Sequence, residues 1–307
     1  MKPIKWKKEQ LKLFWYWMNE RHNIYTVRKA GGEWPWTKDK ILRAYKFTNV
    51  FRQLDRVTEE WTKRYVARLG GAKKLSDGDL LFQCAEFRLF NWPDTYDCLH
   101  YNMGLKWNVK RAIQLLTERQ NVDHEQIFTG AYIIPNAGRT DPKVQVICEA
   151  LQVFYDKRDK LAKRIRKFRS MERTVELLSD IPTIGGFIGY EIACDLRHTR
   201  LLADATDILS WANPGPGARR GIHRLITGSA DKVRDIDYVR HMRQLYIATR
   251  ESHVLSEDIV KCEWPFEMRE IEHSLCEFDK YMRVKNKEGR PRSRYRPPIP
   301  KQLDLLE

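Results

Sequence analysis

The chain has 307 residues, which is enough for one large domain or two ordinary ones. Its formal charge of +15 at pH 7 indicates a polyanionic partner, with DNA as the first choice and RNA as the second. No apolar run approaches the roughly 18 residues that a membrane-spanning helix needs. The N-terminus lacks the apolar core of a secretory signal, so we expect no membrane association and a cytoplasmic location.

The six cysteines are scattered, without any CxxC pair, and no histidine lies at zinc-finger spacing from them. We therefore expect no zinc or other metal site, and at this chain length disulfides are not needed for stability. The ordinary interpretation is that these are reduced cysteines in helix cores.

Apolar spacing predicts a mainly helical, all-α protein. Between the first two predicted helices, Trp36 lies in the loop Gly31–Thr37, where it could wall a base pocket or simply fill the core. Gly70 and Gly71 end the second helix. In the N-terminal half the predicted helical ranges are 7–24, 38–69, 78–91 and 94–118, of which the last holds one or two helices.

The predicted helix 38–69 carries a polar pattern. Asn49, Arg52 and Arg56 recur at i, i+3 and i+7 on one helix face, with Asp55 beside them. An asparagine on an apolar and basic helix can read a base edge. Salt bridges on a solvated helix are the ordinary explanation, and both interpretations stay open at this point.

Residues 142–169 form the clearest amphipathic helix of the sequence. Its second half is strongly basic and includes Lys163, Arg164 and Lys167. This half is either a solvated helix face or a ridge that faces DNA phosphates.

The segment Ile181–Phe187 is the most informative part of the chain. It lies between helix patterns at 171–179 and 187–197, and together they predict a helix-hairpin-helix near residues 172–197. Glycines let the main chain of such a turn approach a DNA phosphate closely, although Gly turns also join many unrelated helix pairs. We expect DNA-backbone contacts from Thr183, Ile184, Gly185, Gly186 and Phe187.

Two carboxylates follow the hairpin, three residues apart. If this stretch is helical, Asp204 and Asp207 share a face, and one can act as a general base that the other orients. In the alternative interpretation, one carboxylate caps a helix and the other is a salt-bridge partner.

A glycine-rich stretch, Gly215–Gly221, overlaps a predicted rigid loop at 213–217 and contains Arg219 and Arg220. Glycines that flank two arginines can bring backbone donors and guanidinium groups to one anion, either a diphosphate leaving group or a DNA phosphate. A purely structural turn is the alternative. The phosphate-binding pattern GxxxxGK[ST] does not occur in the chain.

The C-terminal part is predicted to hold helices at 234–250 and 265–283. We interpret residues 1–284 as one helical catalytic unit with two lobes around a cleft, and residues 285–307 as a basic, Pro-rich tail. The tail is expected to be extended, and its charge suits phosphate contact.

Taken together, these features resemble a phage-associated family of DNA base hypermodification proteins, the α-glutamyl/putrescinyl thymine pyrophosphorylases or amino acid:DNA transferases. A related helical domain accompanies 5-hydroxymethyluracil DNA kinases. The resemblance covers most of the chain, and its blocks are specific only as a set: Pro35-Trp36-Thr37, Phe47 to Arg56, Phe90-Asn91, Ile181 to Phe187, Asp204 with Trp211, Gly215 to Gly221, Leu275-Cys276-Glu277-Phe278 and Lys280-Tyr281.

The resemblance implies a DNA-glycosylase-like helix-hairpin-helix fold that leaves the glycosidic bond intact. A separate 5-hydroxymethyluracil DNA kinase would activate the base, and this chain would replace the (pyro)phosphate with an amine, from an amino acid or putrescine. The implied partners are double-stranded DNA with a flipped-out modified base, the kinase pathway and the amine co-substrate. No further cofactor is firmly implied, and a phage-encoded chain would act in the host cytoplasm.

The resemblance also implies residue roles. Asp204 would take the proton of the attacking amine, with Asp207 as a second catalytic carboxylate. Arg219 and Arg220 would neutralise the leaving group or nearby phosphates. Thr183 departs from the glycosylase hairpin, which has glycine at that point. The substrate pocket would include Trp36, Asn49, Arg52, Asp55, Arg56 and Trp211.

Two other functions stay open. A true DNA glycosylase would use Asp204 to stabilise the positive charge that develops on the sugar. A non-catalytic DNA-binding subunit would position a separate 5-hydroxymethyluracil DNA kinase.

Overall fold

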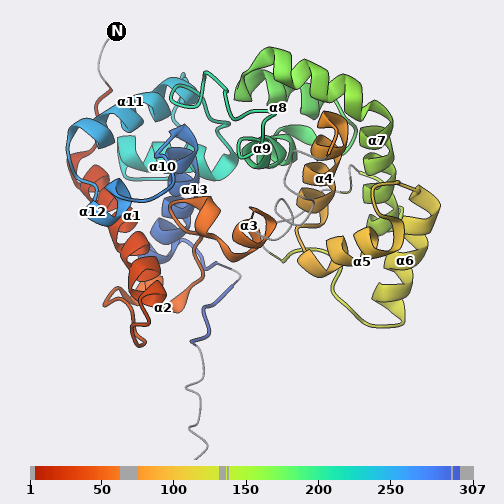
Figure 1. Cartoon of the computed structure of the whole chain (residues 1–307). Coiled ribbons are helices and arrows are strands. Elements are labelled where there is room, and N and C mark those ends of the chain that lie inside the picture. Colours follow the sequence, from red (N-terminus) through yellow and green to blue (C-terminus); the bar gives the residue numbers. More distant parts are fainter. Residues whose placement is uncertain (1–3, 63–74, 131–135, 137, 292, 298–307) are drawn as a thin grey trace, which may run out of the picture. The chain divides into compact units, whose positions relative to one another are not determined.

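The computed structural model describes residues 4–62, 75–130, 136, 138–291 and 293–297. Within these ranges the regular secondary structure is helical, apart from an isolated antiparallel bridge between Tyr45 and Arg294 (Figure 1). The all-α prediction is therefore confirmed. The chain divides into two compact units, and each is described by itself.

Unit 1 comprises residues 1–52 and 214–307. Its core is rich in aromatic rings, and Phe14 of its first helix meets Phe278 of its last edge to face, with ring centroids 5.4 Å apart. The helices are α1 (Lys8–Lys29), α2 (Lys40–Ala44), α10 (Pro216–Thr227), α11 (Tyr238–Glu251), α12 (Glu257–Val260) and α13 (Met268–Lys285).

Helices α10 and α13 pack together at unusually close range because α10 presents glycines to α13. A Cβ atom built on Gly221 would lie 2.5 Å from the Leu275 carbonyl oxygen, and one on Gly217 would overlap the Cys276 side chain. Glycine is therefore required at both positions by helix packing.

Unit 2 comprises residues 53–213. Helix α4 is almost completely buried and packs against α7 and α9, while α8 packs against α9. The helices of unit 2 are α3 (Arg56–Glu60), α4 (Asp77–Phe90), α5 (Pro93–Met103), α6 (Val109–Asn121), α7 (Lys143–Phe168), α8 (Met171–Ser179) and α9 (Gly185–Leu196). The short 3-10 helix η1 (Arg52–Leu54) crosses the boundary between the two units in the sequence.

The predicted helix over 38–69 is wrong in its described part. Helix α2 ends at Ala44, and the next regular element is η1 at Arg52. The reason is a long-range pairing: the Lys46 N–H donates to the Ser293 carbonyl at 3.2 Å, and the Tyr295 N–H donates to the Ala44 carbonyl at 3.0 Å. The backbone groups that would continue the helix are used by the C-terminal segment. Residues 63–74 of the predicted helix lie outside the described residues.

The other predicted helices are confirmed with small shifts at their ends, and the range 94–118 holds two helices, α5 and α6. All six cysteines are free. None of the helices in the described ranges is long and apolar enough to cross a membrane.

Candidate functional site

Helices α8 and α9 form a tight helical hairpin. The turn between them is closed by backbone hydrogen bonds, one from the Ile181 N–H to the Leu178 carbonyl and one from the Ile184 N–H to the Ile181 carbonyl, both 3.1 Å long. Thr183 has a φ of 72°, in the left-handed region that favours glycine. The conformation expected of a glycine is thus kept at Thr183, at a cost in backbone strain.

The turn presents its main chain to solvent. Ile184 is 1% exposed and anchors the turn in the core, whereas Gly185 and Gly186 are exposed and the Phe187 side chain is 44% exposed. No side chain caps the start of α9, and the first N–H groups of a helix have no partner within the helix. This turn therefore has the geometry to hold an anion such as a phosphate, and contact with DNA stays a prediction.

Asp207 lies at the start of α8, where it caps the helix. One carboxylate oxygen accepts hydrogen bonds from the Ser170 hydroxyl at 2.7 Å and the Glu172 N–H at 3.1 Å, and the other accepts from the Met171 N–H at 2.8 Å. Both oxygens are thus engaged in holding the loop after α9 on the first turn of α8. A catalytic role for Asp207 stays a prediction.

Asp204 lies at the surface, beside the junction of α7 and α8. Its carboxylate pairs with the Arg169 guanidinium at 2.8 Å, and the two side chains are 55% and 56% exposed. Arg169 is the C-cap of α7, with a φ of 48°, and its carbonyl accepts the Thr206 N–H at 2.9 Å. The carboxylate is therefore accessible and lies next to a cation. A catalytic role for Asp204 stays a prediction.

The loop that carries both carboxylates returns to the hairpin. The Trp211 ring lies edge to face on Tyr190, 5.9 Å between centroids, and the Asn213 amide donates to the Gly186 carbonyl at 3.1 Å. The loop thus runs from the first turn of α8 to the first turn of α9. Because α8 is a nine-residue helix, its two ends are about 13 Å apart. Asp204 lies near the first end and the hairpin turn lies at the second.

The basic half of α7 leads directly to Asp204. Lys163, Arg164 and Lys167 are exposed on it, as predicted for either a solvated face or a phosphate-facing ridge. On the same helix, Arg166 pairs with Asp77 at 3.0 Å, and Arg200 pairs with the same carboxylate at 2.7 Å. Although burial favours the neutral carboxyl, the hydrogen bonds from these arginines lower the pKa of Asp77 below its ordinary value.

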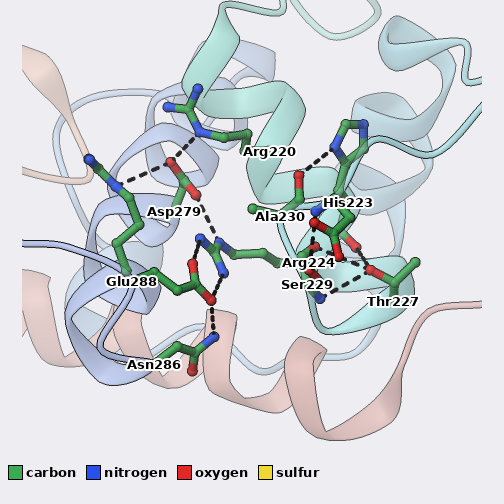
Figure 2. Close-up of polar contacts among 11 residues, drawn as sticks. Arg220, His223, Arg224, Thr227, Ser229, Ala230, Asp279, Asn286 and Glu288 are labelled. Atoms are coloured by element: carbon green, nitrogen blue, oxygen red, sulfur yellow. Dashed lines mark hydrogen bonds and ion pairs between the residues drawn. The ribbon is translucent and has the colours of Figure 1, made fainter.

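Residues 213–215 lie outside regular secondary structure, as predicted for a loop at 213–217, whereas α10 begins at Pro216, so the rest of the glycine-rich stretch is helical. A Cβ atom on Gly217 or Gly221 would meet α13. The Arg220 Nε donates to buried Asp279 at 2.8 Å (Figure 2). Exposed Arg219 donates to the Pro214 carbonyl at 2.8 Å and lies over the Tyr238 ring. The glycines are explained by packing, and phosphate binding by the two arginines stays a prediction.

The residues Asn49, Arg52 and Arg56 do not share a helix face. Asn49 is buried in an irregular segment, Arg52 begins η1, and Arg56 begins α3 just after Asp55. The helical spacing that suggested one face is therefore wrong, while roles in a substrate pocket stay predictions. Trp36 lies in unit 1, half-buried, and its indole N–H donates to the Gly32 carbonyl at 2.6 Å.

Sequence reasoning missed Arg169 and Asp279. Arg169 is one of many basic residues in its helix, and only its position before the helix-starting Ser170 could have singled it out. Asp279 is buried and binds Arg220 and Arg224, which lie one turn apart, so a spacing of four between arginines was the available signal.

The sequence of the chain is similar to known proteins. A family model described as "5-hmdU DNA kinase, helical domain" matches residues 8–290. A curated 5-hmdU DNA kinase of Bacillus phage SP10 is 29% identical over 284 residues, which cover 87% of this chain and 44% of that protein. The chain thus spans less than half the length of this relative. No solved structure matches the chain.

The match to the family model includes every helix of the described residues in both units. The chain belongs to the family of the 5-hmdU DNA kinase helical domain.

Proposed function

We propose that the chain is a DNA base hypermodification enzyme that displaces (pyro)phosphate from activated 5-hydroxymethyluracil in DNA with an amine. The chain belongs to a family named for an enzyme that acts on 5-hmdU in DNA, and this supports modified 5-hydroxymethyluracil in DNA as the substrate. The net charge of +15 supports a polyanionic partner. The amine donor is an amino acid or a polyamine.

The reaction is a nucleophilic substitution at the methylene carbon that carries the phosphate. The amine nitrogen forms a bond to this carbon, the bond from carbon to phosphate oxygen breaks, and the oxygen leaves with the electron pair. Asp204 takes the proton that the nitrogen loses, so that the product is a neutral amine and not an ammonium group that could leave again. Arginine side chains stabilise the negative charge on the departing phosphate.

The observation that carries the proposal is that the basic ridge of α7 is linked directly to exposed Asp204 and to the hairpin helices within unit 2. The basic ridge of α7 ends at Arg169, Arg169 binds exposed Asp204, and the next residue, Ser170, begins the hairpin helices. A DNA strand held on the ridge and the hairpin turn would pass Asp204. Of the two aspartates in this loop, Asp204 has the exposed carboxylate, whereas both carboxylate oxygens of Asp207 accept hydrogen bonds. A base swung out of the duplex can then meet the Asp204 carboxylate.

Phosphorylation of the base is a different reaction. The curated relative is named as a kinase, but more than half of that protein lies outside the match. This chain has no GxxxxGK[ST] pattern for nucleotide phosphates. We therefore assign this chain the transfer step and not the activation step.

DNA glycosylase activity is the second candidate function. It is favoured by the same order of elements, a hairpin with a left-handed turn residue followed by an accessible aspartate. Nothing in the comparisons favours the third function, a non-catalytic partner of a kinase.

Product analysis by mass spectrometry separates these functions. DNA with phosphorylated or pyrophosphorylated 5-hydroxymethyluracil is incubated with the protein and a panel of amines, and the nucleosides are released and weighed. The proposal expects an amine adduct and free (pyro)phosphate in equal amounts. Free base or an abasic site identifies a glycosylase, and unchanged nucleosides with every amine contradict both enzymatic functions.

A further inference from the structure

Three aromatic rings from distant parts of the sequence meet at one place in unit 1. Tyr295 stacks on Trp34, with 5.3 Å between centroids and 24° between planes. Trp36 meets both rings edge to face, with centroids 5.2 Å from Trp34 and 5.8 Å from Tyr295. All three side chains are only half-buried, so each keeps part of its surface open to solvent.

The C-terminal segment that brings Tyr295 to the tryptophans is held in place. Just after α13, Glu288 accepts two hydrogen bonds from the fully buried Arg224, at 2.6 and 3.2 Å (Figure 2). Further on, Ser293 and Tyr295 pair with the backbone next to α2. This part of the tail is therefore a built element of unit 1, and it fixes the ring of Tyr295 before any ligand arrives.

Cationic side chains lie close to the three rings in space or in sequence. The Arg28 guanidinium lies over the Trp36 ring, 5.5 Å from its centroid, and Arg294 and Arg296 flank Tyr295 in sequence and are exposed. None of these three arginines forms an ion pair with an acidic side chain in the part of the chain that the structure describes. Their charges are thus available to an external anion.

We propose that the surface formed by Trp34, Trp36, Tyr295, Arg28, Arg294 and Arg296, which we call the aromatic platform, binds unpaired bases of single-stranded DNA. Aromatic rings interleaved with cations bind a single strand, because each base offers a π-face and each nucleotide a phosphate. A base inside a duplex is stacked on its neighbours and cannot offer its face. The rings already support one another, so little conformational entropy is lost on binding.

This inference goes beyond the proposed function, since it concerns another unit of the chain and needs no modified base. The structural alternative is that the rings only fasten the C-terminal segment to unit 1. That alternative explains the stacking but gives no role to three arginines that form no ion pair with the described acidic residues.

Photo-crosslinking tests the platform in the unmodified 307-residue chain. Single-stranded oligonucleotides with 5-iodouracil at successive positions are bound and irradiated, and the crosslinked peptides are identified by mass spectrometry. The platform predicts crosslinks to Trp34, Trp36 or Tyr295. Crosslinks that fall solely on other peptides would overturn it.

Binding of an unmodified single strand, followed by fluorescence anisotropy, gives a second test. The double variant Arg294→Glu/Arg296→Glu changes only exposed side chains, and we expect its affinity to fall at least tenfold. Its salt dependence should weaken by about 0.7 in slope for each phosphate that the variant no longer neutralises. The control is Lys232→Glu/Arg234→Glu, which makes the same charge change on another exposed loop of unit 1.

Trp36→Ala adds a test of stacking, with an expected loss of about tenfold. Equal losses in the charge-reversed platform and the control would refute the proposal. Neither measurement depends on amine transfer, so failure of the enzymatic function would leave both results interpretable.

Discussion

The two aspartates that follow the hairpin differ in their surroundings although they lie three residues apart. Asp207 accepts three hydrogen bonds at the start of α8, while Asp204 makes one exposed ion pair with Arg169. The first arrangement is typical of a helix cap and the second of a residue that can change partners. Stability and catalysis are therefore expected to be divided between them.

Thermal unfolding tests this division. Asp207→Ala leaves the first N–H groups of α8 without their acceptor, and we expect it to reduce the free energy of unfolding by about 1–2 kcal/mol. Asp204→Ala removes only a surface ion pair and is expected to leave the melting temperature nearly unchanged. Calorimetry of both variants beside the wild type gives the answer, and an equal or larger loss for Asp204→Ala would show that the assignment is reversed.

At the scale of elements, the basic ridge of α7 is predicted to provide affinity for duplex DNA. Lys163→Glu/Lys167→Glu reverses two exposed charges, so we expect weaker binding and a salt dependence reduced by about 0.9 for each phosphate that the ridge no longer neutralises. The matched control is Lys106→Glu/Lys110→Glu, also exposed and in unit 2. Titration of duplex DNA at several salt concentrations measures both, and identical changes in the two variants would indicate a general charge effect without a ridge.

The packing of α10 on α13 gives a second prediction at this scale. A methyl group at Gly221 would meet the backbone of Leu275, which cannot move aside as a flexible side chain does. Gly221→Ala should therefore lower the melting temperature clearly. Gly130→Ala, where nothing lies within 4 Å of the new Cβ, is the control. If Gly221→Ala has the same melting temperature as the wild type, the close approach of the two helices is incorrect.

The same elements show what the sequence could predict. Helix α7 was found within one residue at each end because its apolar positions repeat locally at helical spacing. The stretch after Ala44 was misassigned because its backbone partners, Ser293 and Tyr295, lie about 250 residues away and leave no local pattern. The predicted loop at 213–217 is wrong only for residues 216 and 217, which belong to α10, because the close packing of Gly217 on α13 leaves no local pattern in the sequence.

For the candidate site, the sequence predicted residue types better than it predicted partners. It singled out the hairpin turn and Asp204, and the structure places the turn and Asp204 at the surface of unit 2. It gave no sign that Arg169 would bind Asp204 or that Asp279 would bind Arg220, because ion pairs formed by folding depend on which helices meet.

At the scale of the whole molecule, buried carboxyl groups make stability depend on pH. Burial raises the pKa of Glu86 in unit 2 to about 8, although a hydrogen bond from Gln83 acts in the opposite direction and lowers this pKa. Burial likewise raises the pKa of Glu270 in unit 1 to about 7. Both groups bind a proton in the folded chain over a pH range in which the unfolded chain has lost it, so folding stability falls as pH rises.

The pH window follows from these pKa values. Glu86 lowers stability progressively from its unfolded pKa of 4.5 to about pH 8, by at most about 1.4 kcal/mol for each pH unit. Between pH 7 and 8 the contribution of Glu270 has levelled off. Glu86→Gln keeps a neutral side chain of the same shape, so we expect its melting temperature to vary less than that of the wild type in this interval.

Denaturation curves at pH 6, 7 and 8 provide the measurement, with exposed Glu118→Gln as the control that should follow the wild type. A wild-type stability that rises steadily over this range, with the same slope in Glu86→Gln, would show that Glu86 is ionised in the folded chain.

The most direct test is a single-turnover experiment on DNA that carries activated 5-hydroxymethyluracil and a saturating amine. For Asp204→Asn we predict an amine-transfer rate at least a hundredfold below that of the wild type, because the proton acceptor is lost, with DNA affinity unchanged. Asp141→Asn, which removes another carboxylate paired with an arginine in unit 2, should react at the wild-type rate. A wild-type rate for Asp204→Asn would contradict the assignment of Asp204 as the catalytic base.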